Sequence, residues 1–210
     1  MAKIFTDAAR IGVSRVIEPL ARGLLRIGLS PDAVTVLGTL GVVAAAIGFA
    51  ARGEFLAATL LVAAFALVDT LDGTMARVRG YSTRFGAMLD SAMDRVGDGA
   101  VFGALAFWYA TTGETPTFIA ALICLVAAQV ISYVKARAQS VGLRCEVGLV
   151  ERAERLLLVG VGGLATGLGV GWALPAALWL LAVLSVFTVV QRILHVRRVD
   201  RDASAPGPAG

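Results

Sequence analysis

The chain has 210 residues, of which 58% are apolar and 16% charged, and its mean hydropathy is +0.80. This composition excludes an ordinary soluble domain, a collagen-like chain and a disulfide-stapled one, and it predicts an integral membrane protein. We interpret the net charge of +4 as basic flanks of membrane spans, with no nucleic-acid partner. Cys124 and Cys145 are too few for a metal-thiolate site, and we expect both to remain thiols.

Residues 1–29 interleave basic and apolar side chains without the apolar core or cleavage site of a signal peptide. They predict an amphipathic helix lying on the membrane surface. A turn at Ser30 begins the membrane domain, 30–202, and the Pro- and Gly-rich tail 203–210 is predicted to be disordered.

Six apolar runs within that domain are candidates to cross the bilayer, because a transmembrane helix needs roughly 20 residues. They cover 33–51, 55–71, 85–109, 116–134, 156–171 and 172–194. The expected fold is therefore an all-α integral membrane protein with six transmembrane helices after an N-terminal amphipathic interfacial helix.

The basic residues predict how these spans are oriented. Every Lys and Arg except Arg52 falls before the first span, between the second and third, between the fourth and fifth, or after the last, if Arg95 is counted with the entry to the third span and Arg192 with the end of the last. By the positive-inside rule we expect a multi-pass protein of the cell membrane with both termini in the cytoplasm.

Four carboxylates stand near the ends of the second and third spans, where an unpaired acid is costly, about 2.5–3.5 kcal/mol at the bilayer centre. They form two pairs at helical spacing, Asp69 with Asp72 and Asp90 with Asp94. Oxygen ligands without His or Cys favour Mg²⁺, Mn²⁺ or Ca²⁺. Asp98, one turn further along, is predicted to make an internal polar contact instead.

The stretch Asp69-Thr-Leu-Asp72-Gly73-Thr-Met-Ala76-Arg77, eight residues, then Gly86-Ala-Met-Leu-Asp90-Ser-Ala-Met-Asp94 resembles the signature of the CDP-alcohol phosphotransferases. The resemblance implies a homodimer with a cytoplasmic active site that transfers the phosphatidyl group of CDP-diacylglycerol to an alcohol and releases CMP. It also implies that Asp69, Asp72 and Asp90 hold one or two metals, Mg²⁺ with Mn²⁺ as the alternative. Asp94, in the same metal site, would be the general base.

The family also contacts its nucleotide lipid before the first span, at positions matched here by Pro31, Asp32 and Thr35. Asp32 replaces the usual Asn, which keeps an acceptor and loses the amide donor. The predicted set for binding CDP-diacylglycerol is completed by Asp69, Gly73, Arg77, Ser82 and Thr83.

A cationic cluster on the same side as the acids suits an acceptor that itself carries phosphate. It resembles that of the actinobacterial phosphatidylinositol phosphate synthases, which implies inositol 1-phosphate as the acceptor, bound by Lys135, Arg137, Arg152, Arg155 and Arg192. Positive-inside flanks would place several of these cations there in any case. Glycerol 3-phosphate is the alternative acceptor.

Two other classes of function remain to be weighed. A small cation transporter would place its acids near the midplane and carry an inverted repeat, which the sequence does not display. A metal-binding scaffold would have no use for a base such as Asp94.

Three glycines near the end of the fifth run, Gly163, Gly167 and Gly171, have GxxxG spacing. They predict close helix contacts, within one subunit or across a dimer.

Overall fold

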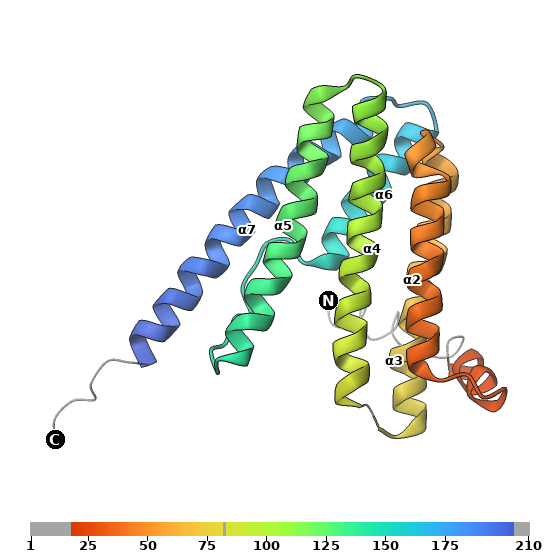
Figure 1. Ribbon diagram of the computed structural model, residues 1–210, viewed down its shortest axis with the longest axis vertical. Coiled ribbons are helices and arrows are strands. Elements are labelled where there is room, and N and C mark those ends of the chain that lie inside the picture. Colours follow the sequence, from red (N-terminus) through yellow and green to blue (C-terminus); the bar gives the residue numbers. More distant parts are fainter. Residues whose placement is uncertain (1–17, 82, 204–210) are drawn as a thin grey trace, which may run out of the picture. The chain divides into compact units, whose positions relative to one another are not determined.

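The computed structural model describes residues 18–81 and 83–203, and all regular structure in these ranges is helical (Figure 1). Residues 18–26 form a short helix. The remaining elements are α2 (Pro31–Gly48), η1 (Ala50–Arg52), α3 (Phe55–Arg79), α4 (Arg84–Thr111), α5 (Thr115–Ser140), α6 (Arg152–Gly167) and α7 (Ala173–Ala203). The all-α class is confirmed, whereas most of the predicted surface helix and nearly all of the predicted tail lie outside the described residues.

Four of the described helical segments are long and apolar enough to cross a membrane, namely Pro31–Arg52, Phe55–Arg79, Thr115–Ser140 and Ala173–Asp202. Helix α4 is long enough but carries Asp90, Asp94, Arg95 and Asp98, and α6 has only 16 residues. The described helices therefore support a multi-pass membrane protein, while the count of six spans stays a prediction.

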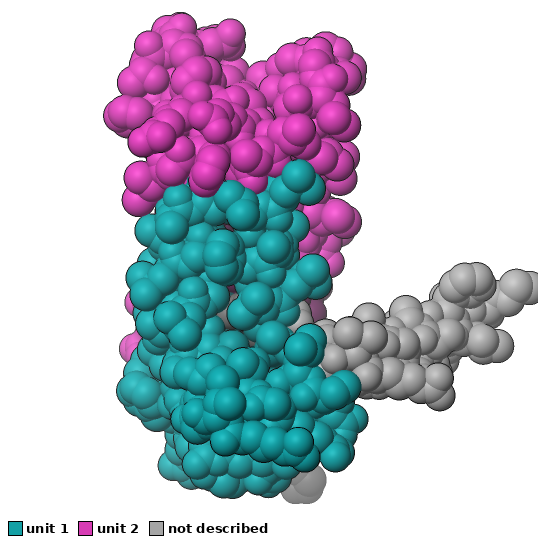
Figure 2. Space-filling model, turned by 90° about the vertical axis from the view of Figure 1, so that its right-hand side faces the viewer, with its two compact units in different colours: residues 1–45, 60–97 teal, residues 46–59, 98–210 magenta. Residues whose placement is uncertain are grey.

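The chain divides into two compact units, which Figure 2 shows in different colours. Unit 1 comprises residues 1–45 and 60–97, and unit 2 comprises residues 46–59 and 98–210. Helices α2, α3 and α4 each contribute residues to both units, so we describe the packing of each unit separately.

Unit 1 has a small apolar core where the helix over residues 18–26 meets α2 and α3. Ala21, Val34 and Met75 are buried there. Further along, a Cβ added at Gly41 of α2 would lie 2.3 Å from the ring of Phe65 on α3. The absence of a side chain at Gly41 thus lets the two helices approach closely.

In unit 2, helices α5 and α6 both pack against α7 (Figure 1). Helix α6 also meets the first turns of α3, where Gly163 faces Thr59 and Gly167 faces the backbone of Leu56. Two of the three glycines at GxxxG spacing therefore make close contacts within the subunit, whereas Gly171 has open space around it. Cys124 and Cys145 are buried free thiols, as expected.

Candidate active site

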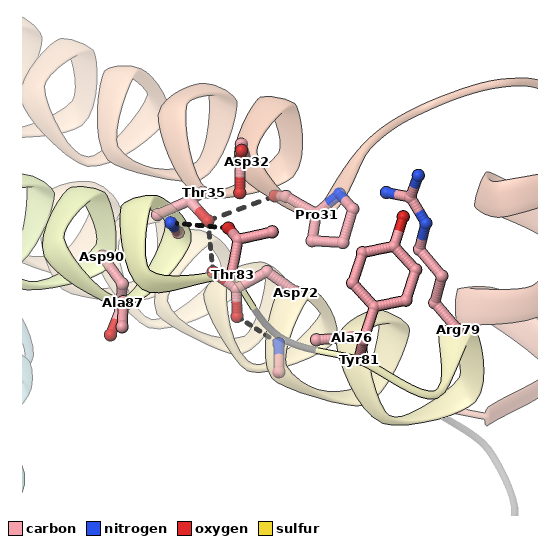
Figure 3. A pocket seen from close by; sticks show the side chains of 12 residues that line it. Pro31, Asp32, Thr35, Asp72, Ala76, Arg79, Tyr81, Thr83, Ala87 and Asp90 are labelled. Atoms are coloured by element: carbon pink, nitrogen blue, oxygen red, sulfur yellow. Dashed lines mark hydrogen bonds between the residues drawn. The ribbon is translucent and has the colours of Figure 1, made fainter.

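A cavity of about 190 Å³ in unit 1 collects residues from α2, α3, α4 and the loop before α4 (Figure 3). Seven of its lining residues belong to the predicted site, namely Pro31, Asp32, Thr35, Asp72, Gly73, Thr83 and Asp90. Ala76, Arg79, Tyr81, Gly86 and Ala87 complete the lining.

Two helices begin at this cavity, and each has a hydroxyl side chain at its start. The Ser30 hydroxyl accepts the backbone N–H of Ala33 at 3.1 Å, and the Thr83 hydroxyl accepts that of Gly86 at 2.9 Å. These are N-cap hydrogen bonds. Pro31 at the first position of α2 has a backbone angle already suited to a helix. The positive ends of two helix dipoles therefore meet at the cavity, which favours an anionic ligand.

The carboxylate of Asp72 is oriented by two hydrogen-bond donors, one from α2 and one from α3. One oxygen accepts the hydroxyl of Thr35, which also lies 3.1 Å from the carbonyl of Pro31, and the other accepts the backbone N–H of Gly73. Thr35 is buried, and Asp72 is half-buried. Asp72 is thus linked to the start of α2.

The two motif glycines have different surroundings. A Cβ added at Gly73 would meet nothing within 4 Å, so this position leaves room beside Asp72 for a ligand. A Cβ at Gly86 would lie 3.0 Å from both Asp32 Oδ1 and Thr83 Oγ1. Gly86 therefore permits the close approach of α4 to α2.

The remaining acids of the motif do not all line the cavity. Asp90 is exposed at its edge, whereas Asp94 lies outside the lining with its side chain 18% exposed and paired with Arg95 at 3.3 Å. Asp69 lies on α3, but its side chain is outside the described residues, as is Ser82. Among the described side chains, which do not include that of Asp69, no three His, Cys, Asp or Glu lie close enough together to hold a metal.

Arg77 is placed near the motif but not in the cavity lining. Its Nε donates to the carbonyl of Gly73 at 3.2 Å, and a terminal nitrogen donates to the hydroxyl of Thr74 at 3.0 Å. The guanidinium is exposed and folded back along α3.

The structure adds Arg79 and Tyr81, which are not among the predicted site residues. Helix α3 ends at Arg79, and Gly80 adopts φ +85°, a left-handed conformation that terminates the helix. The chain then brings the Tyr81 ring within 4.7 Å of the Arg79 guanidinium, and both side chains line the cavity. Gly80, which directly follows the basic end of α3, is the sequence signal from which this turn could have been predicted.

The predicted acceptor cations lie in unit 2, where two of them surround Asp98. Arg155 donates to Asp98 Oδ2 at 2.7 Å, and both side chains are only 1% exposed. Arg152 Nε lies 3.6 Å from Asp98 Oδ1. The expected internal polar contact of Asp98 is confirmed, and α4 is joined to α6 by a buried ion pair.

Two more cations share Glu151 at the start of α6. Its Oε1 lies 3.5 Å from Lys135 Nζ and accepts from Arg192 at 2.9 Å. Arg192 is 2% exposed and also donates to the carbonyls of Val147 and Ile131, at 2.7 and 2.8 Å. This residue therefore fastens the loop before α6 to α5 and α7.

Arg137 is separate from both groups. It is exposed, and its guanidinium donates to the hydroxyl of Ser140 on the same helix at 3.3 Å. Lys135 and Arg137, two positions apart on α5, point in different directions, as helical geometry requires.

Residues 29–199 match the family model described as CDP-alcohol phosphatidyltransferase. The phosphatidylinositol phosphate synthase of Mycobacterium marinum is 52% identical over 192 residues, which are 90% of this chain and 82% of that protein. That of Streptomyces avermitilis is 47% identical over 205 residues, 94% and 84% of the two chains.

Solved structures agree with this similarity. The crystal structure of Mycobacterium tuberculosis phosphatidylinositol phosphate synthase with CDP-diacylglycerol bound has a TM-score of 0.87 at 47% identity, covering 92% of this chain and 99% of that one. The same enzyme in complex with manganese and citrate has a TM-score of 0.86, also at 47% identity, covering 91% and 93%.

Proposed function

Because the chain belongs to the CDP-alcohol phosphatidyltransferase family, we propose that it is a phosphatidylinositol phosphate synthase. It transfers the phosphatidyl group of CDP-diacylglycerol to inositol 1-phosphate and releases CMP. The observation that carries this proposal is the complete acidic signature on α3 and α4, in a chain that is 52% identical to a synthase of that name.

The cavity of unit 1 suits the nucleotide diphosphate of the lipid substrate. Two helix N-termini provide a positive field for its phosphates, and the open space at Gly73 leaves room for them. Pro31, Asp32 and Thr35 contribute from α2, and Asp69, Arg77, Ser82 and Thr83 complete the proposed set.

Asp69, Asp72, Asp90 and Asp94 form the proposed metal site. The two whose side chains line the cavity, Asp72 and Asp90, offer only oxygen ligands, which suits a hard divalent cation such as Mg²⁺ or Mn²⁺. When bound, such a cation neutralises negative charge on the diphosphate.

In the proposed reaction, the acceptor hydroxyl attacks the phosphorus that carries the diacylglycerol. A new P–O bond forms to the inositol oxygen, and the bond to the bridging oxygen of the diphosphate breaks. That electron pair leaves with CMP. The Asp94 carboxylate takes the proton of the attacking hydroxyl, a general-base role for which its partly buried position is suited.

We assign the phosphate of inositol 1-phosphate to the cations of unit 2. Arg152 and Arg155 gather at Asp98, and Lys135 and Arg192 gather at Glu151, so four of the five predicted residues form two compact groups. The exposed Arg137 stays in the proposed set as a separate contact. The active site and both termini are proposed to face the cytoplasm, and the assembly is proposed to be a homodimer.

The test is CMP release by the purified protein from CDP-diacylglycerol. We expect release with inositol 1-phosphate, loss of activity with EDTA and recovery with Mg²⁺ or Mn²⁺. Inositol, serine and glycerol 3-phosphate serve as comparison acceptors. Preference for glycerol 3-phosphate would replace the acceptor assignment, and inactivity with every acceptor and metal would overturn the enzyme assignment.

A second measurement separates binding from chemistry. Asp94→Asn is expected to lower turnover by roughly 100-fold or more, the scale of general-base catalysis, while CDP-diacylglycerol still protects the protein against thermal unfolding. Glu114→Gln changes an exposed acid that directly precedes α5. It is the matched control and should leave turnover unchanged. Full activity of Asp94→Asn would remove Asp94 from the base role.

A further inference from the structure

The ion pair of Asp98 with Arg155 in unit 2 is more deeply buried than charges in a basic flank of a membrane span would be. Asp98 and Arg155 are each 1% exposed, and their hydrogen bond of 2.7 Å joins α4 to α6. A pair formed only to orient the protein in the membrane would lie at the water interface. The burial of both partners indicates that they have a fixed arrangement.

One donor of the buried pair is not used. Arginine remains protonated in proteins, so Arg155 keeps its positive charge beside the carboxylate of Asp98. The Nε of Arg155 is buried and makes no hydrogen bond among the described residues. A buried cationic group with an unused donor favours an additional anion.

From this arrangement we infer that Asp98 is a positioning residue for the acceptor phosphate, acting through Arg155. The inference rests on the proposed function. Asp98 occupies one terminal nitrogen of the guanidinium and so fixes its plane. The unused Nε–H then has a fixed direction in which it can donate to a phosphate oxygen, since a guanidinium presents its donors in a rigid plane. A lysine could not be oriented in this way.

Asp98 also holds Arg155 in place before the acceptor binds. With the carboxylate present, the guanidinium has a charged partner, and its unused Nε keeps a donor for the phosphate. Without the carboxylate, the buried guanidinium would lose that partner, and Arg155 would turn toward water or toward a backbone carbonyl. The acceptor site would then lose its geometry, whereas the lining of the nucleotide cavity in unit 1 would not change.

The primary experiment compares Asp98→Asn with the unaltered full-length enzyme by measuring separate KM values for the two substrates. We expect the KM for inositol 1-phosphate to rise about tenfold or more, because misplacement of a binding group by 1 Å is costly. The KM for CDP-diacylglycerol should stay within about twofold, since its proposed residues lie in unit 1. Equal increases in both KM values, or no change in either, would overturn the inference.

A charge-reversed variant keeps the test informative even if Asp98→Asn folds poorly. Asp98→Arg combined with Arg155→Asp restores an ion pair between α4 and α6 but moves the guanidinium to the other helix. We expect its Tm to recover relative to Asp98→Arg alone, without recovery of the KM for inositol 1-phosphate. Recovery of both would mean that the pair is only structural and would contradict the positioning role.

A binding measurement distinguishes failure of this inference from failure of the proposed function. Protection against thermal unfolding is measured with inositol 1-phosphate alone, for the unaltered enzyme, Asp98→Asn and the control Glu114→Gln. Protection of the unaltered enzyme and the control, but not of Asp98→Asn, supports the inference. Equal protection of all three overturns the inference alone, whereas an unaltered enzyme that neither binds nor uses inositol 1-phosphate overturns the function and the inference with it.

Discussion

At the scale of single residues, the hydroxyl of Thr35 links the start of α2 to Asp72, an acid of the proposed metal site. Thr35 is buried, and its hydroxyl donates to the Asp72 carboxylate. Replacing it with valine keeps the shape and removes the donor. We expect Thr35→Val to weaken Mg²⁺ activation by about 10–100-fold, the usual effect of losing a group that orients a metal ligand.

The measurement is the Mg²⁺ concentration that gives half-maximal CMP release. Thr35→Ser keeps the hydroxyl and is the matched control, expected to stay within a few-fold of the unaltered enzyme. If the serine and valine variants respond to Mg²⁺ alike, the hydroxyl does not orient Asp72.

Tyr81 offers a second test at this scale, because its ring and the Arg79 guanidinium together line the cavity. An exposed cation–π contact is worth about 0.5–1 kcal/mol. We expect Tyr81→Leu to raise the KM for CDP-diacylglycerol about two- to fivefold, since Arg79 loses its support. Tyr81→Phe keeps the ring and should not change this KM, and a similar rise in both variants would assign the effect to the phenol hydroxyl instead.

These residues show how far the sequence could predict the site. The spacing of the aspartates and glycines was enough to select Asp72, Gly73 and Asp90, which line one cavity, because all three belong to the local signature. The hydrogen bond from Thr35 to Asp72 joins residues 37 positions apart, and no local pattern contains it. The same holds for the ion pair of Asp98 with Arg155, 57 positions apart.

At the scale of elements, the apolar runs predicted where helices begin better than where they end. Helices α3, α4 and α5 begin within one residue of the predicted runs, because turns and breaks stand directly before them. Helix α3 continues to Arg79, eight residues beyond its apolar run, because the polar stretch that carries Asp72 and Arg77 is also helical. Hydropathy reports contact with lipid, and helix formation does not require that contact.

The packing of α6 on α7 gives an element-scale prediction. A Cβ at Gly162 would lie 2.7 Å from the Cβ of Ala177 and 3.2 Å from Cα of Leu174, so alanine at this position would force the helices apart. Overpacking of this kind costs about 1–3 kcal/mol. We expect Gly162→Ala to lower the Tm of the purified protein by several degrees.

Gly160, on the same helix, is the matched control because a Cβ there would meet nothing within 4 Å. Alanine favours a helix over glycine by about 0.5–1 kcal/mol, so Gly160→Ala should leave the Tm unchanged or raise it. A lower Tm in both variants would point to a general sensitivity of α6 rather than to its contact with α7.

At the scale of the whole molecule, the amino-acid composition was sufficient to predict a membrane protein but not the number of its membrane spans. The excess of apolar residues requires burial in lipid, and four described helical segments fit that requirement. Helix α4 does not, because the acids of the proposed site also lower its hydropathy. A functional helix inside a bundle is therefore harder to recognise from hydropathy than one that faces lipid.

The orientation of the molecule in the membrane can be tested on a single helix. Helix α5 has 26 residues, which at about 1.5 Å per residue gives about 39 Å, longer than the hydrocarbon layer of roughly 30 Å. Its ends, Thr115 and Ser140, are both exposed. Lys135 and Arg137 stand near the Ser140 end, so the positive-inside rule predicts that this end is cytoplasmic and that Thr115 faces outward.

The measurement is labelling of single cysteines by a membrane-impermeant maleimide, with the buried Cys124 and Cys145 first replaced by alanine. In intact cells we expect Thr115→Cys to be labelled and Ser140→Cys to react only after the membrane is opened. Both variants should retain CMP release, which shows that the labelled protein is folded. The opposite labelling pattern would place the basic loops, and with them the proposed site, on the outer face of the membrane.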